Sequence, residues 1–179
     1  MTMKKLFIGA IAGLFSLAAL AVSVGDGSGV AIQTREYSLN NDSVTLAHAA
    51  ATTNAYGSIT LGNLPEGLIV IHGAVLDVGG VIAGVGTNTT TISASVGVAA
   101  ATSSSLTGTV ANIVASSSAT GWTNRVTKIG GVSTAEVVRD GTATAPTLYL
   151  NVAVPVSLTN GTLSANGKVR VTFSNIGDK

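Results

Sequence analysis

The side chains that could perform chemistry are few and widely separated in this sequence. It contains two histidines, His48 and His72, and eight carboxylates that stand singly along the chain. A serine–histidine–aspartate triad is possible by count, because serines are abundant and Asp77 and Asp140 are available. However, no serine lies in the Gly-x-Ser-x-Gly turn that presents a nucleophile, and no carboxylates have the local spacing of a calcium loop or a glycosidase pair. We therefore expect no catalytic, cofactor-binding or metal-binding residues.

The two histidines have different surroundings. His72 lies in "IVIHGAV", where apolar neighbours predict a buried strand, so we interpret it as a structural histidine with satisfied hydrogen bonds rather than a ligand or base. His48 lies in an Ala-rich stretch, and nothing nearby in sequence would orient its ring. The glycine-rich strings "GDGSG" and "GGVIAGVG" lack the spacing of a dinucleotide or phosphate loop and are predicted to be turns.

Charge is scarce. Only 9% of the 179 residues are charged, the formal net charge is +1, and there is no cysteine. Soluble domains carry about 25% charged residues, so this surface is weakly solvated unless partners cover it, which favours assembly. No basic stripe with interleaved aromatic residues is present, so nucleic-acid binding is not expected. Without cysteine, the chain has neither a disulfide nor a thiolate metal site.

Two pairs of adjacent opposite charges and one tryptophan are candidates for contacts with partners. Neighbours on a strand face opposite sides, so Arg35-Glu36 and Arg139-Asp140 are interpreted as solvated or inter-subunit positions rather than internal pairs. Trp122, the only tryptophan, either covers the edge of a core or anchors an interface.

The first residues are apolar behind a basic start. Lys4 and Lys5 precede an uncharged run from Leu6 to Val24, and "ALA" at 19–21 supplies small residues for a signal peptidase. Residues 1–24 are therefore either a signal cleaved near Ala21 or a retained helical anchor or buried arm, so membrane contact through residues 6–24 is possible. The Gly-rich residues 25–32 are expected to form a flexible linker.

Residues 33–179 read as a β-sandwich domain. In "LYLNVAVPVSL" (148–158) every second residue is aliphatic, which predicts a strand with one dry face. In "KVRVTFS" the inward set is Val169, Val171 and Phe173, with Lys168, Arg170 and Thr172 facing water. We expect an edge-like strand at 31–39, a loop-prone connection at 43–57 and a weak strand at 106–116, with further strands at 58–64, 68–78, 89–98, 126–133 and 134–138.

The end of the chain carries two candidate hairpin turns, Asn160-Gly161 and Asn166-Gly167. With seven to nine short strands and no convincing amphipathic helix after the leader, the fold class is all-β. We expect an antiparallel sandwich resembling a jelly roll, preceded by an apolar helical segment.

Four strings occur together in a known class of protein: "TREYSL", "AYGSITLGNLPEGLIVIHGAVLDV", "LYLNVAV" and the terminal "GKVRVTFSNIGD". On these strings, residues 33–179 resemble small virion structural proteins of tailed bacteriophages, of the capsid decoration or cement type. The resemblance implies a β-rich protein that packs on a capsid exterior and reinforces contacts between coat subunits. It brings no catalytic residues, and the apolar leader has no counterpart in it.

The sequence leaves three functions open. The first is a non-enzymatic capsid decoration or minor capsid subunit on the virion surface, with the major capsid protein or further copies of itself as partners. The second is an exported bacterial surface or adhesion-type sandwich, secreted or held at the cell surface, which would explain the leader directly. The third is a hydrolase on a jelly roll using His72, the least favoured because no motif supports it.

Overall fold

The computed structural model describes residues 31–48, 54–83, 91–120, 127–132, 137–154 and 159–177. The apolar leader, most of the linker, Trp122 and residues 155–158 lie outside this part of the chain. The described residues form nine strands and one short 3-10 turn, η1. The bounds are β1 Ile32–His48, β2 Ala55–Asn63, β3 Gly67–Ala83, β4 Thr91–Gly97, η1 Gly108–Val110, β5 Val114–Thr120, β6 Thr127–Val132, β7 Val137–Gly141, β8 Thr147–Val154 and β9 Gly161–Gly177.

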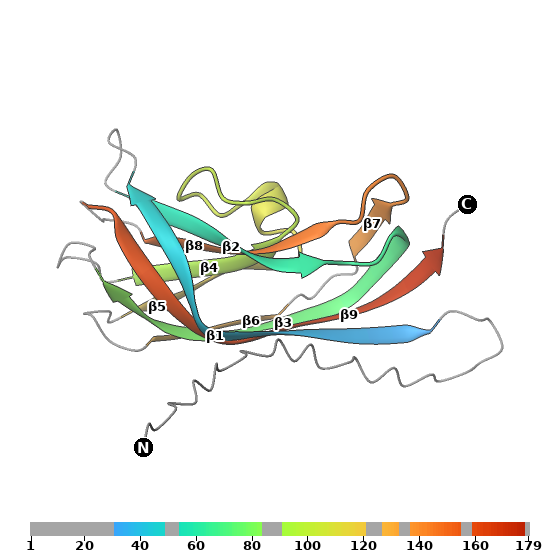
Figure 1. The fold of residues 1–179 in the computed structure, drawn as a ribbon, viewed down its shortest axis with the longest axis horizontal. Coiled ribbons are helices and arrows are strands. Elements are labelled where there is room, and N and C mark those ends of the chain that lie inside the picture. The colour runs from blue at the N-terminus through green and yellow to red at the C-terminus, as the bar shows by residue number, and fades with distance from the viewer. Residues whose placement is uncertain are drawn as a thin grey trace, which may run out of the picture.

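The strands form one antiparallel sheet in the order β5-β4-β8-β2-β1-β9-β3-β6, and β7 pairs with the beginning of β3. The prediction of an all-β antiparallel fold is therefore confirmed. The sheet curls into a half-barrel, so that β2, β8 and β4 face β1, β9 and β3 across the core (Figure 1). The end strands β5 and β6 lie beside each other.

The core follows from strict alternation along the strands. On β9, Val169, Val171 and Phe173 are at most 1% exposed, as predicted, because successive side chains of a strand point to opposite faces. On β8, the predicted set Leu148, Leu150, Val152 and Val154 is buried in the same way. The largest fully buried side chains are Phe173, Leu46, Leu64, Ile69, Ile71, Leu76, Ile82, Ile92, Ile113, Leu148 and Leu150.

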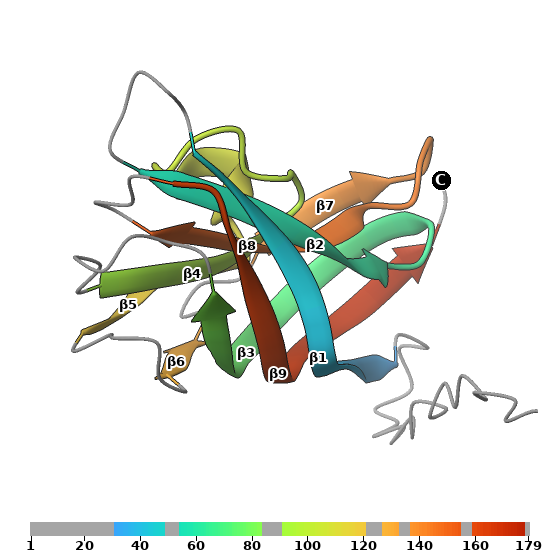
Figure 2. The same cartoon turned by 60° about the vertical axis from the view of Figure 1, so that its left-hand side comes forward.

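Three long strands bend together, as Figure 2 shows for β1, β9 and β3. At the bend, β1 carries a bulge between Asn40 and Asp42, where Asn41 has a φ of 57°. Asn41 exchanges hydrogen bonds of 2.9 and 3.0 Å with Asn166 on β9. The next residue, Gly167, has a φ of 132°. A bulge and a glycine at this point let the paired strands turn without losing their ladder.

Several expectations about local structure were wrong. Neither Asn160-Gly161 nor Asn166-Gly167 forms a hairpin turn. Asn160 directly precedes β9, and Asn166-Gly167 lies inside that strand. The strand before them, β8, pairs with β2 and β4 rather than with β9. Residues 43–48 of the expected loop belong to β1. Of the weak strand at 106–116, only the last residues join β5. In each case tertiary pairing outweighed the local sequence signal.

The expectation of an edge strand holds for the first half of β1. This strand pairs with β9 from Ile32 to Leu46, but its ladder with β2 consists only of Ala47↔Tyr56 and His48↔Ala55. Before the bend, β1 therefore has a ladder partner on one side only among the described strands.

Candidate interaction surfaces

The histidines and aspartates that the sequence offered for chemistry do not lie together at one site. Asp140, on β7, accepts hydrogen bonds from the backbone N–H and hydroxyl of Thr142, at 3.0 and 2.7 Å, and these bonds lower the pKa of its carboxyl. His48 ends β1, where its backbone N–H donates to Asn160 Oδ1 at 2.7 Å. Asp77 lies on the exposed face of β3. Among the described residues, no three His, Asp or Glu side chains gather as a metal site would require.

His72 is not the buried histidine that the apolar neighbours predicted. It is exposed on the outer face of β3, at the bulge between Ile71 and Gly73, and its Nε2 lies 2.7 Å from the hydroxyl of Ser174. Ile69 and Ile71 face the core, so regular alternation turns His72 outward, and the bulge after it lets Ala74 face the core in place of Gly73. Sequence reasoning did not find Ser174, because its pairing depends on the register between β3 and β9.

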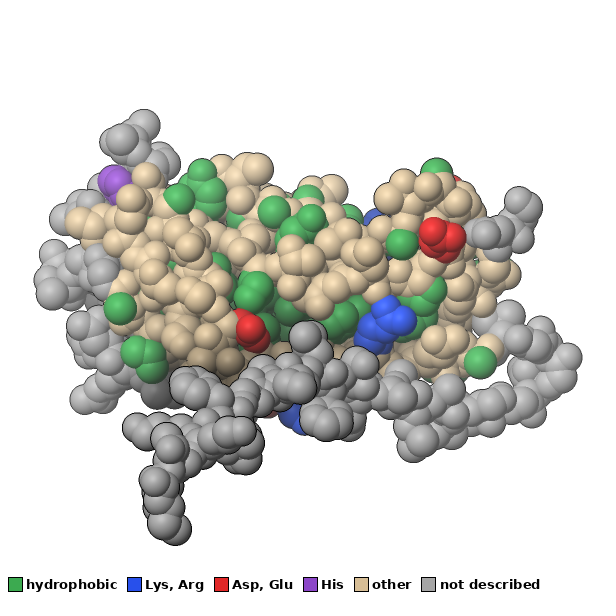
Figure 3. Space-filling model, in the orientation of Figure 1, with side chains coloured by type: hydrophobic (Ala, Val, Ile, Leu, Met, Phe, Trp, Pro, Cys, Tyr) green, Lys and Arg blue, Asp and Glu red, His purple; other side chains and the backbone are tan. Residues whose placement is uncertain are grey.

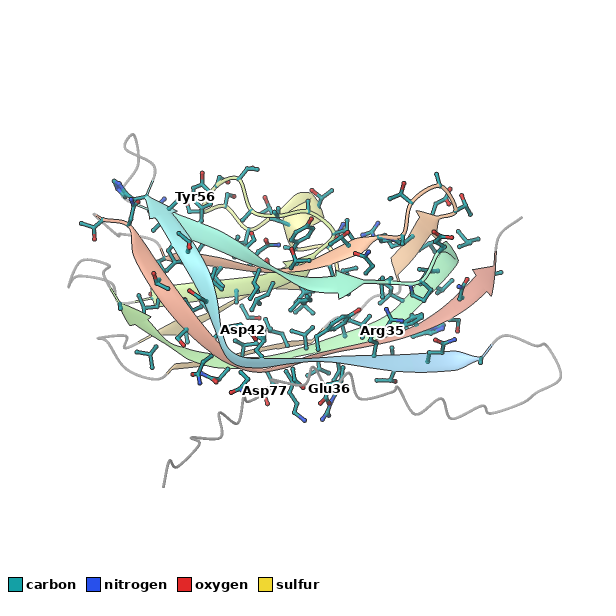
Figure 4. All side chains as sticks on the ribbon, viewed as in Figure 1. Arg35, Glu36, Asp42, Tyr56 and Asp77 are labelled. Carbon is teal, nitrogen blue, oxygen red and sulfur yellow. The ribbon has the colours of Figure 1, made fainter. Side chains whose placement is uncertain are left out.

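The outer face of β1, β9 and β3 carries a cluster of charges. Glu36 forms two ion pairs. Its Oε1 lies 2.7 Å from Lys168 Nζ, and its Oε2 lies 2.6 Å from Arg170 Nε. The ladders place Asp77 of β3 opposite Lys168 and Glu36 of β1 opposite Arg170. The hydrogen bonds from Lys168 and then Arg170 hold the pKa of Glu36 below its ordinary value. Figure 4 shows Glu36 and Asp77 pointing away from the core on this face.

Two valines of β3 are exposed beside this cluster. Val75 is 43% exposed opposite Arg170, and Val81 is 42% exposed opposite Ser164. We call the side chains of Glu36, Val75, Asp77, Val81, Lys168 and Arg170 the outer patch. An exposed sheet face that combines aliphatic groups with charges of both signs has the composition of a protein contact surface.

The prediction that the neighbours in Arg35-Glu36 and in Arg139-Asp140 face opposite sides is confirmed. Glu36 and Asp140 are exposed, as the solvated interpretation requires, and a contact with another subunit stays a prediction. Glu36 forms ion pairs within the chain, to Lys168 and Arg170. Arg35 and Arg139 are half-buried rather than solvated. Burial lowers the pKa of Arg139, whose Nε has no hydrogen-bond partner. The cross-strand partners that decide this come from β9 and β3, far away in sequence.

Arg35 and Tyr37 occupy the gap where β1 and β2 diverge. Arg35 Nη1 donates to the carbonyl oxygen of Asn63 at the end of β2, and its guanidinium lies 6.0 Å from the ring centre of Phe173. The Tyr37 hydroxyl is buried and makes no hydrogen bond of good geometry. Burial raises the pKa of this phenol, and the neighbouring Arg35 guanidinium lowers that pKa by a smaller amount. Figure 4 places Arg35 between the two layers, and Figure 3 shows hydrophobic side chains along the same side of the molecule.

A segment without long strands covers the face of β8 that points away from the core. Asn151 is fully buried on the face opposite to the core, where residues 98–113 fold over it; we call these residues the covering segment. Asn151 Nδ2 donates to the carbonyl oxygens of Ala99 at 3.0 Å and Val110 at 2.8 Å. Its Oδ1 accepts from the Ser58 hydroxyl at 2.6 Å and from the Ala101 N–H at 2.9 Å. The prediction that β8 has one dry face was therefore incomplete, because both of its faces are covered.

Comparison of the chain with protein-family models, with curated protein sequences and with solved structures found no match. In the part of the chain that the structure describes, no helix has the length and hydropathy needed to cross a membrane.

Proposed function

We propose that the protein is a non-enzymatic structural subunit of a virion, which decorates or cements the capsid surface through protein–protein contacts. The observation that carries this proposal is the outer patch, an exposed sheet face on which Val75 lies opposite Arg170 of the Glu36 ion pairs and Val81 lies farther along β3. Such a face can bury aliphatic area while its charges orient the partner. The low charge of the chain and its resemblance to decoration proteins support the same function.

The finer description of the fold belongs to this proposal. A jelly-roll-like sandwich, preceded by an apolar helical segment that is retained or removed near Ala21, would give the subunit a rigid body for a lattice. Partners in this proposal are the major capsid protein or further copies of the chain, and nucleic acid is not among them.

A second function is an exported surface or adhesion-type subunit. It is favoured by one observation, the order of Lys4-Lys5, the uncharged run from Leu6 to Val24 and "ALA" at 19–21, which is the order of a secretory signal. N-terminal sequencing of the natural product tests it, because a chain that begins at Val22 indicates cleavage, whereas an intact leader contradicts export by this route.

The test of the virion proposal first looks for a coat-protein gene beside this one, which the proposal predicts, and then uses shells assembled from that coat protein. The purified protein is mixed with the shells and sedimented. We expect co-sedimentation that saturates at a fixed ratio of subunits to shell and falls at least about tenfold in affinity for Val75→Glu, because a charge at a contact core is costly to desolvate. Absence of the protein from sedimented shells would contradict the proposal.

The matched control is Ser116→Glu, which places the same charge on an exposed position of β5, away from the outer patch. It should bind shells like the parent protein. If both variants lose binding equally, added charge and not the outer patch is responsible, and the assignment of this face is wrong. Equal melting temperatures of the two variants and the parent show that the fold is intact.

A further inference from the structure

We propose that the open edge of β1, from Ile32 to Leu39, binds an extended peptide segment of the assembly partner, and that Arg35 and Tyr37 hold a carboxylate of that segment. This inference rests on the proposed function, because it names the chemistry of the partner that such a subunit would bind. The segment would add a strand beside β1, on the side away from β9.

The edge itself is the first step. From Ile32 to Leu39, β1 pairs with β9 on one side and has no ladder partner on the other among the described strands. Backbone N–H and C=O groups of alternate residues therefore point outward from the sheet, where they can pair with an extended chain. The bulge at Asn40 and Asp42 breaks the regular ladder and limits the site to the residues before it.

The second step is the charge on the inner face beside this edge. Along β1 the inward-facing residues are Gln33, Arg35, Tyr37 and Leu39, as their alternating burial shows. Within the described residues, no carboxylate forms an ion pair with Arg35. One of its nitrogens donates to Asn63, which leaves further N–H groups of the guanidinium for another acceptor.

The third step is the Tyr37 hydroxyl, two residues along the same face. It is buried beside the Arg35 guanidinium and makes no hydrogen bond of good geometry, and a buried polar group in that state is costly. A guanidinium and a phenol are both donors at neutral pH, so the group that satisfies them together is an acceptor with negative charge. A carboxylate has this property and forms the stronger, charge-assisted type of hydrogen bond.

The occupant is a partner protein rather than the same strand of a second copy. In an antiparallel pair of two copies related by a two-fold axis perpendicular to the sheet, equal faces lie on the same side, so a second β1 would bring Gln33, Arg35, Tyr37 and Leu39 to this face. That set contains no carboxylate and would add a second arginine. The fitting segment has a Glu or Asp near Arg35, an aliphatic side chain near the buried Leu39, and neutral polar residues on the outside, where Glu36 already lies.

The experiment titrates the full chain with a nine-residue peptide, acetyl-Thr-Val-Ser-Val-Thr-Glu-Ser-Val-Thr-amide, and follows binding by calorimetry or fluorescence anisotropy. The matched probe replaces Glu by Gln. We expect the Glu peptide to bind at least about tenfold more tightly than the Gln peptide, and Arg35→Gln to remove this preference. The control Arg170→Gln removes an arginine from the outer face of β9 and should keep the preference.

A second variant tests the site without endangering the fold. Tyr37→Phe deletes only a hydroxyl that makes no hydrogen bond of good geometry, so the melting temperature should change little while the Glu peptide binds several-fold more weakly. The proposal is overturned by no binding of the Glu peptide up to about millimolar concentration, by equal binding of the two peptides, or by equal effects of Arg35→Gln and Arg170→Gln. Co-sedimentation with shells in the same preparation shows separately whether the virion function holds.

Discussion

The fully buried Asn151 of β8 donates a 2.8 Å hydrogen bond to the carbonyl oxygen of Val110, and this contact joins the strand to the covering segment. The two residues are 41 positions apart in the sequence. The side-chain amide binds both ends of the segment, since its other bonds reach Ala99 and Ala101. A single polar side chain therefore bonds three backbone groups of the segment. Val110 also accepts from Ser95 Oγ and the Ala101 N–H also donates to Ser58 Oγ, whereas the donor to the Ala99 carbonyl is Asn151.

The first prediction concerns this amide. Asn151→Leu keeps a similar volume but leaves the carbonyl of Ala99 without its donor and removes one of two donors to the carbonyl of Val110, which also accepts from Ser95 Oγ at 2.7 Å. We therefore expect a loss of about 2 kcal/mol in the free energy of unfolding. Chemical denaturation measures it, and amide hydrogen exchange should speed up in residues 98–113. The control Asn112→Ala should cost less than about 1 kcal/mol, since Val98 N–H also donates to Thr109. Equal costs would contradict the assigned role of Asn151.

The second prediction concerns the bend of β9. A Cβ at Gly167 would overlap the carbonyl oxygen of Asp77 and lie 2.9 Å from the Cα of Val78, at a φ of 132° that other residues avoid. We expect Gly167→Ala to destabilise the fold by about 2 kcal/mol or more. Gly73 is a residue of β3 that pairs with β9, and a Cβ there would have no neighbouring atom within 4 Å, so Gly73→Ala should be tolerated. The melting temperatures of both variants test this prediction. An unchanged melting temperature for Gly167→Ala would show that the bend needs no glycine.

The third prediction concerns the core side of β9. Val171 is fully buried, so Val171→Asp places an unpaired charge among aliphatic side chains and should cost about 4 kcal/mol or more. Val152→Asp on β8 should behave in the same way, since that side chain is 1% exposed. The exposed Val75 is the comparison, because Val75→Asp should leave the unfolding midpoint almost unchanged. Similar midpoints for Val171→Asp and Val75→Asp would contradict the inward orientation of Val171.

The fourth prediction concerns pH. The ion pairs lower the pKa of Glu36 in the folded state, so the folded protein holds this proton less tightly than the unfolded chain. The stabilisation is present above the unfolded pKa of Glu36 and is lost as the pH falls through the folded value. We expect Glu36→Gln to lose less stability than the parent between about pH 6 and pH 3. The effect should be small and should weaken with salt, because these charges are exposed.

Melting curves across this pH range at low and high ionic strength measure the difference. Glu66→Gln is the control, since Glu66 lies outside the cluster of Lys168 and Arg170. If it flattens the pH profile as much as Glu36→Gln, the profile does not report these ion pairs.

Much of the local structure could be predicted from alternation alone. The aliphatic residues of "LYLNVAV" and "KVRVTF" identified which side chains of β8 and β9 face the core, because a pleated strand has a period of two whatever its neighbours are. Edge character at 31–39 was predicted correctly for the same half of β1 that has one ladder partner. The small number of catalytic residue types was also visible in the sequence.

The tertiary structure alone decided what surrounds those strands. The second cover over β8 comes from a low-complexity segment whose Ser and Thr residues carry no periodic signal, and its anchor at Asn151 depends on contacts between distant positions. Ladder register placed Glu36 beside Lys168 and Arg170, and packing of Ile69 and Ile71 on the core face put His72 on the outer face. A periodic pattern in sequence shows which face of a strand is apolar. It does not fix the pairing between strands, because many registers are compatible with the same pattern. The register is selected by the whole fold, through its buried area and its satisfied polar groups.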